Sequence, residues 1–96
     1  MSTFAMRIEL NGPPPRSVYD RLHEALARSG FNRSIVGYDG KRYKLPDGMY
    51  VGNLNTNDSV AAHDHIKSVV NSVHNSSEVV AFLYSSSAWT GLRQIA

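Results

Sequence analysis

The residues best suited to chemistry gather near the middle of the chain, where cations alternate with aromatic side chains. Cations neutralise phosphates, and aromatic faces stack on unpaired bases, so this mixture is typical of a surface that binds single-stranded nucleic acid. The alternative is an ordinary edge hairpin, in which Lys and Arg discourage aggregation and Tyr favours the strand. The candidate residues for binding such a nucleic acid are Arg33, Tyr38, Lys41, Arg42, Tyr43 and Lys44.

Proton transfer needs a side chain that titrates near neutral pH, and the chain has four histidines. His23 lies near Asp20 and is the candidate general acid or base, although a solvated helix histidine is the simpler interpretation. His63 and His65 are two positions apart, so on a helix they diverge and cannot share a metal ion. The acids are dispersed, and no Gly-rich phosphate loop or other catalytic signature is present. We therefore expect neither a metal site nor a cofactor.

Trp89, followed by Gly91 and Leu92, is the one tryptophan of the chain. A large aromatic side chain in a tail is more often an anchor than a ligand-binding group. We expect Trp89 to hold the tail against the sheet or against a second subunit.

Alternating apolar and polar residues predict a first strand from Thr3 to Leu10. A helix should follow, with Ser17 as its N-cap and Gly30 as its C′ residue. A second strand is expected from Phe31 to Tyr38. Asp39-Gly40 then predicts a type I′ hairpin turn, and residues 41–45 return as a short strand or an extended segment.

The second half of the chain repeats the pattern of strand, helix and strand. A third principal strand is expected from Met49 to Leu54, and Thr56 is the predicted N-cap of a second helix. The apolar run within Glu78 to Ser85 predicts the last strong strand. Residues 88–95 form a tail that can add an edge strand.

The order of elements is β-α-β-β-α-β, which predicts an α+β, ferredoxin-like domain spanning residues 1–96. Right-handed crossovers would place both helices on one face of an antiparallel sheet with strand order fourth, first, third, second. The opposite face then needs cover, and a homodimer would supply it.

Composition narrows the function classes. The chain has 96 residues, a net charge of +2 and no cysteine, which excludes disulfides, thiolate nucleophiles and cysteine-based metal centres. No apolar run is long enough to cross a membrane, and no secretory signal is evident. We expect a cytoplasmic protein that does not enter the membrane.

Several short motifs resemble the GhoS-type family, small bacterial proteins named for an antitoxin endoribonuclease. They comprise Tyr19 with Leu22-His23-Glu24-Ala25, Gly30-Phe31-x-Arg33-x-Ile35, Asp39-Gly40-Lys41-x-Tyr43-x-Leu45-Pro46 and Trp89-x-Gly91-Leu92. The resemblance spans residues 3 to 93. It implies a ferredoxin-like fold, similar to the small CRISPR-adaptation nuclease, and cleavage of a toxin's messenger RNA.

RNA cleavage requires activation of a ribose 2′-hydroxyl and stabilisation of charge on the phosphate. Arg33 and Lys41 are suited to the charge, and Tyr43 or His23 to proton movement, so the candidate catalytic residues are Arg33, Tyr43 and His23. The CRISPR-type relatives carry a metal-binding acid at the end of the first strand. Asn11, or at most Glu9, stands there in this chain. The alternative function is a non-catalytic protein-interaction or regulatory module of the same fold.

Overall fold

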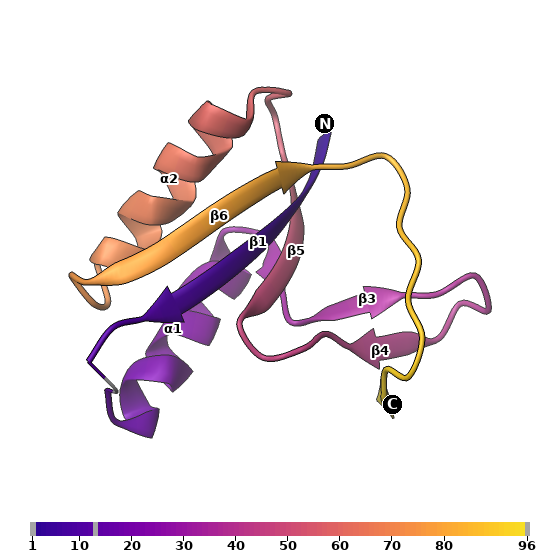
Figure 1. Cartoon of the computed structure of the whole chain (residues 1–96), viewed down its shortest axis with the longest axis horizontal. Helices are drawn as coiled ribbons and strands as arrows, with labels where there is room; N and C mark the ends of the chain where they lie inside the picture. The colour runs from indigo at the N-terminus through magenta and orange to yellow at the C-terminus, as the bar shows by residue number, and fades with distance from the viewer. Residues whose placement is uncertain (1, 13, 96) are drawn as a thin grey trace.

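The computed structural model of the chain describes residues 2–12 and 14–95. These residues form two helices and seven strands. Figure 1 shows how the longer ones are arranged in space. In chain order they are β1 (Ser2–Leu10), α1 (Arg16–Arg28), β2 (Phe31–Asn32), β3 (Ser34–Val36), β4 (Arg42–Lys44), β5 (Met49–Leu54), α2 (Ser59–Asn71), β6 (Ser77–Leu83) and β7 (Gln94–Ile95). No helix in this described part of the chain is long and apolar enough to cross a membrane.

The main sheet has four antiparallel strands in the order β2-β5-β1-β6. The first strand of the chain is therefore central, and β6 and β2 form the edges. The strand order of the main sheet agrees with the order predicted from the sequence, and the arrangement is compatible with a ferredoxin-like domain.

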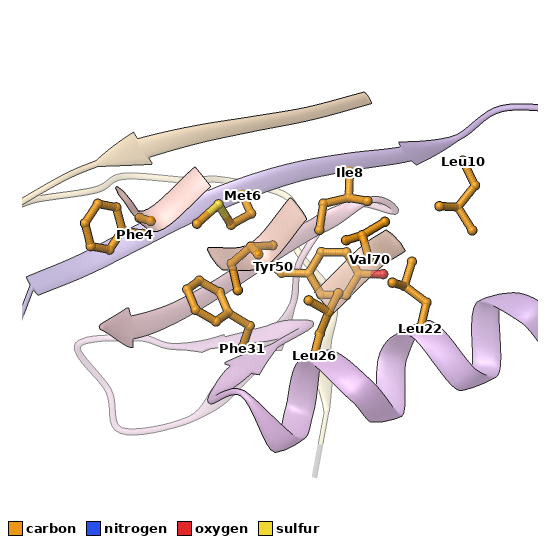
Figure 2. Close-up of a cluster of buried hydrophobic side chains, with 11 residues drawn as sticks. Phe4, Met6, Ile8, Leu10, Leu22, Leu26, Phe31, Tyr50 and Val70 are labelled. Carbon is orange, nitrogen blue, oxygen red and sulfur yellow. The ribbon is translucent and has the colours of Figure 1, made fainter. Parts of the chain in front are cut away.

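One hydrophobic core joins the sheet to both helices. Every second residue of β1 from Phe4 to Leu10 is buried, as the alternating sequence pattern predicts. These side chains share one cluster with residues of α1 and α2, and Figure 2 shows several of them meeting. The most buried members are Phe4, Met6, Leu22, Leu26, Phe31, Ala62, Ile66 and Val70.

The helix ends correct two predictions from the sequence. Helix α1 begins at Arg16, and Pro15 is its N-cap without a side-chain hydrogen bond, so Ser17 lies inside the helix. The fixed φ of proline suits a helix start, and the helix therefore begins before the predicted cap. Asp58, not Thr56, caps α2 by accepting a hydrogen bond from the Val60 N–H at 2.9 Å.

The C-terminal end of α1 confirms the prediction for Gly30. Its φ is +85°, a conformation that glycine adopts without a Cβ clash, and its N–H donates to the Ala27 carbonyl.

The expected strand from Phe31 to Tyr38 is interrupted at Arg33. Strand β2 pairs with β5 in the main sheet, whereas β3 pairs with β4 in a second sheet of order β3-β4-β7. The Arg33 carbonyl accepts a hydrogen bond from the Leu45 N–H at 2.8 Å. The chain thus changes sheets at this bend. Residues 42–44 form a true strand, and the tail pairs with it rather than with the main sheet.

The turn of the β3–β4 hairpin also differs from the prediction. The Gly37 N–H donates to the Lys41 carbonyl, and the Gly40 N–H donates to the Gly37 carbonyl. Gly40 has a φ of +76°, but Asp39 does not have a positive φ. A type I′ turn needs positive φ at both central residues, so this is a type I turn followed by a bulge glycine.

The second sheet and the tail lie near the side of the main sheet that faces away from the core. A mostly apolar groove of about 400 Å³ is lined by Val51 and Phe82 of the main sheet, Ile35 of the hairpin and Trp89 of the tail. Val80 and Phe82 remain exposed.

Candidate functional site

A polar pocket of about 570 Å³ lies where α1, β1, the bend after β2 and the start of β5 approach one another. We call it the His23 pocket. Three arginines and two carboxylates line it together with aromatic side chains. The residues that matter for its chemistry are Arg7, Arg16, Tyr19, His23, Arg33 and Tyr50.

His23 and Arg33, two of the predicted catalytic residues, are brought together in this pocket. Nη1 of Arg33 lies 3.3 Å from Nδ1 of His23. A guanidinium N–H can only donate, so Nδ1 must carry its lone pair in this contact, and the proton of a neutral ring lies on Nε2. The contact therefore favours the neutral imidazole.

The surroundings of His23 also favour the neutral form of its imidazole. Partial burial, followed by the positive charge of Arg33, lowers the pKa of His23 below 6.5. The ring centroid of the imidazole lies 6.5 Å from that of Tyr19 and 6.0 Å from that of Tyr50. His23 is thus a neutral base at physiological pH, with two aromatic rings close to it.

Tyr50 contributes a hydroxyl that remains protonated. It belongs to β5 and is almost completely buried. Burial raises the pKa of Tyr50 to about 12, so the phenol is a hydrogen-bond donor throughout the physiological range.

Asp47 connects the pocket to the hairpin. Its Oδ1 accepts from Nζ of Lys44 at 3.0 Å and lies 3.9 Å from Nη2 of Arg33. The hydrogen bond from Lys44, together with the attraction of Lys44 and Arg33, lowers the pKa of Asp47. Asp47 is therefore ionised and holds Lys44 and Arg33 on the same side of the molecule.

Sequence reasoning missed Arg7, Arg16 and Tyr50 as site residues. Nη1 of Arg7 donates to the carbonyl of Asp47 at 2.5 Å. A Cβ at Gly48 would overlap this guanidinium, so glycine at position 48 makes room for it. The available signal was weak: Arg7 is a cation on the polar side of a strand, and such cations are common on sheet surfaces.

The remaining candidate RNA-binding residues divide between the two faces of the β3–β4 hairpin. Side chains alternate along a strand, so Arg42 and Lys44 share one face and Tyr43 lies on the other. Nη1 of Arg42 donates to Ser34 Oγ at 2.9 Å, and Ser34 and Lys44 are directly opposite each other. Lys44 also lines a smaller pocket together with His23 and Arg33.

Tyr43 forms a separate aromatic group with the tail. Its hydroxyl donates to Oδ2 of Asp39 at 2.6 Å, and its ring centroid lies 6.3 Å from that of Trp89. The hydrogen bond to Asp39 is the main cause of a raised Tyr43 pKa. The contact between Tyr43 and Trp89 therefore anchors the tail to the hairpin.

Tyr38 is fully exposed at the turn, and Lys41 follows it in the same loop.

No protein-family model matches the chain, and no curated protein matches it. Among residues 2–12 and 14–95, no three His, Asp or Glu side chains are grouped so that they could hold a metal ion.

Proposed function

We propose that the protein is a small RNA-binding endoribonuclease of antitoxin type, with a ferredoxin-like fold, that cleaves single-stranded mRNA at the His23 pocket. The observation that carries this proposal is the contact between the neutral imidazole of His23 and the guanidinium of Arg33. It places a base beside a cation, and cleavage at a ribose phosphate requires both.

The proposed reaction begins when a phosphodiester enters the pocket. Arg33 turns from His23 to the phosphate oxygens, which frees the lone pair on Nδ1. His23 then removes the proton of the ribose 2′-hydroxyl, and the 2′-oxygen attacks phosphorus. The bond from phosphorus to the 5′-oxygen breaks, and that oxygen takes a proton from water. The hydroxide left behind takes the proton from the His23 imidazolium, which restores the base, and a 2′,3′-cyclic phosphate remains.

The other residues of the pocket bind and orient the phosphate. Arg7 and Arg16 add positive charge, and Tyr50 supplies a neutral hydrogen-bond donor. Lys44 and Arg42 extend the cationic surface along one face of the hairpin.

The rest of the RNA-binding surface comes from the turn and the other hairpin face. Tyr38 and Tyr43 offer ring faces for stacking, and Lys41 adds a phosphate contact. Tyr43 serves RNA binding in this proposal, because its hydroxyl is already committed to Asp39.

The test is cleavage of single-stranded RNAs by the pure protein, with and without a chelator, followed by identification of the product ends. We expect chelator-resistant cuts that leave 2′,3′-cyclic phosphates. His23→Gln and Arg33→Gln should each reduce the rate at least about 100-fold. Arg28→Gln removes a charge from an exposed α1 residue that pairs with Glu24, and it should leave the rate unchanged.

The proposal fails if no RNA is cut, or if His23→Gln cuts as fast as the original protein. Binding without cleavage would favour the second candidate, a non-catalytic protein-interaction or regulatory module. The exposed apolar side chains of Val80 and Phe82 are the observation that favours it. In either case we propose a cytoplasmic homodimer.

A further inference from the structure

Strand β6 is an edge of the main sheet with an open side. Figure 1 shows it on the opposite side of β1 from β5, and in the described part of the chain it pairs with β1 alone. The strand carries no proline and no lysine, the usual residues that prevent edge strands from pairing with other chains. Its C-terminal half instead exposes Val80, Phe82 and Leu83.

The hydrogen bonds of the sheet show which backbone groups face outward. The Tyr84 N–H donates to Thr3 and the Asn11 N–H donates to Ser76, so the even-numbered residues between them face β1. The N–H and C=O groups of Val79, Ala81 and Leu83 therefore face the open side.

The N-terminal end of this edge is already occupied. Nζ of Lys67, from α2, donates to the Ser77 carbonyl at 2.8 Å and to Ser77 Oγ at 2.7 Å. The open segment therefore runs from Val79 to Leu83, and its midpoint is Ala81.

We propose that β6 pairs with β6 of a second copy of this chain, antiparallel and with Ala81 on the two-fold axis. In this register Val79 is opposite Leu83 of the partner, Val80 is opposite its Phe82, and Ala81 is opposite itself. Every pair is apolar, and the outward backbone groups of three residues bond across the axis.

Charge supports the antiparallel direction. Glu78 lies just outside the open segment, opposite Glu9 of β1. A parallel pairing would bring the Glu78 side chains of the two copies together. The antiparallel register places Glu78 beside Tyr84 of the partner and separates the two carboxylates by about 20 Å at roughly 3.4 Å per residue.

The first test is the mass of the protein in solution over a range of concentrations, by light scattering or sedimentation equilibrium. We expect a dimer. Leu83→Lys, at a residue that is 45% exposed, should raise the dimer Kd at least about tenfold, since each dimer contains the change twice. Val36→Lys is the matched control: it adds the same charge at a strand valine that is 51% exposed and lies in the second sheet, and it should leave Kd unchanged.

The second test fixes the register, because the chain has no cysteine of its own. Val80 and Phe82 of the two copies would form non-hydrogen-bonded pairs, the geometry in which opposing Cα atoms are close enough for a disulfide. The double variant Val80→Cys/Phe82→Cys should become a covalent dimer on oxidation. Val80→Cys alone should not, because its counterpart is two residues away.

A monomer at all concentrations would overturn the proposal, as would a dimer that Leu83→Lys leaves intact. Rapid crosslinking of Val80→Cys alone would overturn the register, since it would place Val80 on the axis. Circular dichroism of each variant checks that the fold is retained. These outcomes do not depend on RNA cleavage.

Discussion

Gly52 occupies a position in β5 where even one methyl group has no room. Phe4 of β1 and Phe31 of β2 are its partners in the neighbouring strands, and both are fully buried. A Cβ at Gly52 would lie 2.8 Å from Cγ of Phe31 and would overlap the Gly30 carbonyl oxygen. Real Cβ atoms do not approach other atoms so closely, so the Gly52→Ala substitution must displace the strand or the ring.

The expected cost follows from what must move. Overpacking a core costs about 1–3 kcal/mol, and the overlap with a backbone oxygen cannot be relieved by a side-chain rotation. We therefore expect a loss of about 3 kcal/mol in the free energy of unfolding. For a domain of 96 residues this lowers Tm by roughly 12–24 °C.

Thermal unfolding followed by circular dichroism measures this loss, and Gly91→Ala is the control. Gly91 has a φ of +77°, and a Cβ there would meet no atom of the described residues within 4 Å beyond its chain neighbours, so its substitution carries only a backbone cost of about 1–2 kcal/mol. The reasoning is refuted if Gly52→Ala melts within about 5 °C of the original protein, or no lower than Gly91→Ala. Phe31→Leu should cost less in the Gly52→Ala background than alone, because the two changes share one space.

Three smaller predictions concern side-chain contacts. Asp58→Ala should lower the free energy of unfolding by about 1 kcal/mol, because the Val60 N–H loses its acceptor, and Asp58→Ser should retain most of it in thermal melts. The pKa of His23 is lower in the folded than in the unfolded protein, so the contribution of His23 to the free energy of unfolding is present above pH 6.5 and is lost as pH falls through the folded pKa. His23→Gln should therefore make the free energy of unfolding, measured with urea, depend less on pH between pH 7.5 and 5. Tyr43→Phe should raise the pKa of Asp39 in an NMR titration, because the hydroxyl is the main cause that lowers it.

Local patterns predicted the elements that depend on local causes. The alternation of Phe4 to Leu10 gave the central strand and its buried face, and Gly30 marked the end of α1. The break at Arg33 was not predicted in this way, because residues 31–38 carry no proline, and Asn32 and Ser34 beside Arg33 are only weak turn signals on their own. The break depends on two different pairing partners: Phe31 pairs with Gly52 of β5, which is distant in the sequence, whereas Ile35 pairs with Tyr43 of β4 in a hairpin of the second sheet.

The residues of the candidate site could be predicted from the sequence only where they lie close together in the chain and a single turn brings them into contact. His23 lies in the middle of α1, and Arg33 follows the short β2, so the two are ten residues apart and meet across a single reversal of the chain. Arg7 and Tyr50 come from the central strand and its neighbour, more than 40 residues apart. A sequence pattern does not show such pairs, because they become neighbours only when the sheet forms.

Cations and aromatic residues that alternate along the sequence do not form one mixed surface when the segment is a strand. The pleat sends Arg42 and Lys44 to one side and Tyr43 to the other. The cations join the side that holds Arg33 and His23, and the aromatic ring joins Trp89. Under the proposed function, a single RNA that uses both groups has to pass from one face of the hairpin to the other, and we expect it to do so at the turn, where Tyr38 is fully exposed. The order of contacts along the RNA would then run from the phosphate in the His23 pocket, past the turn, to bases stacked beside Trp89.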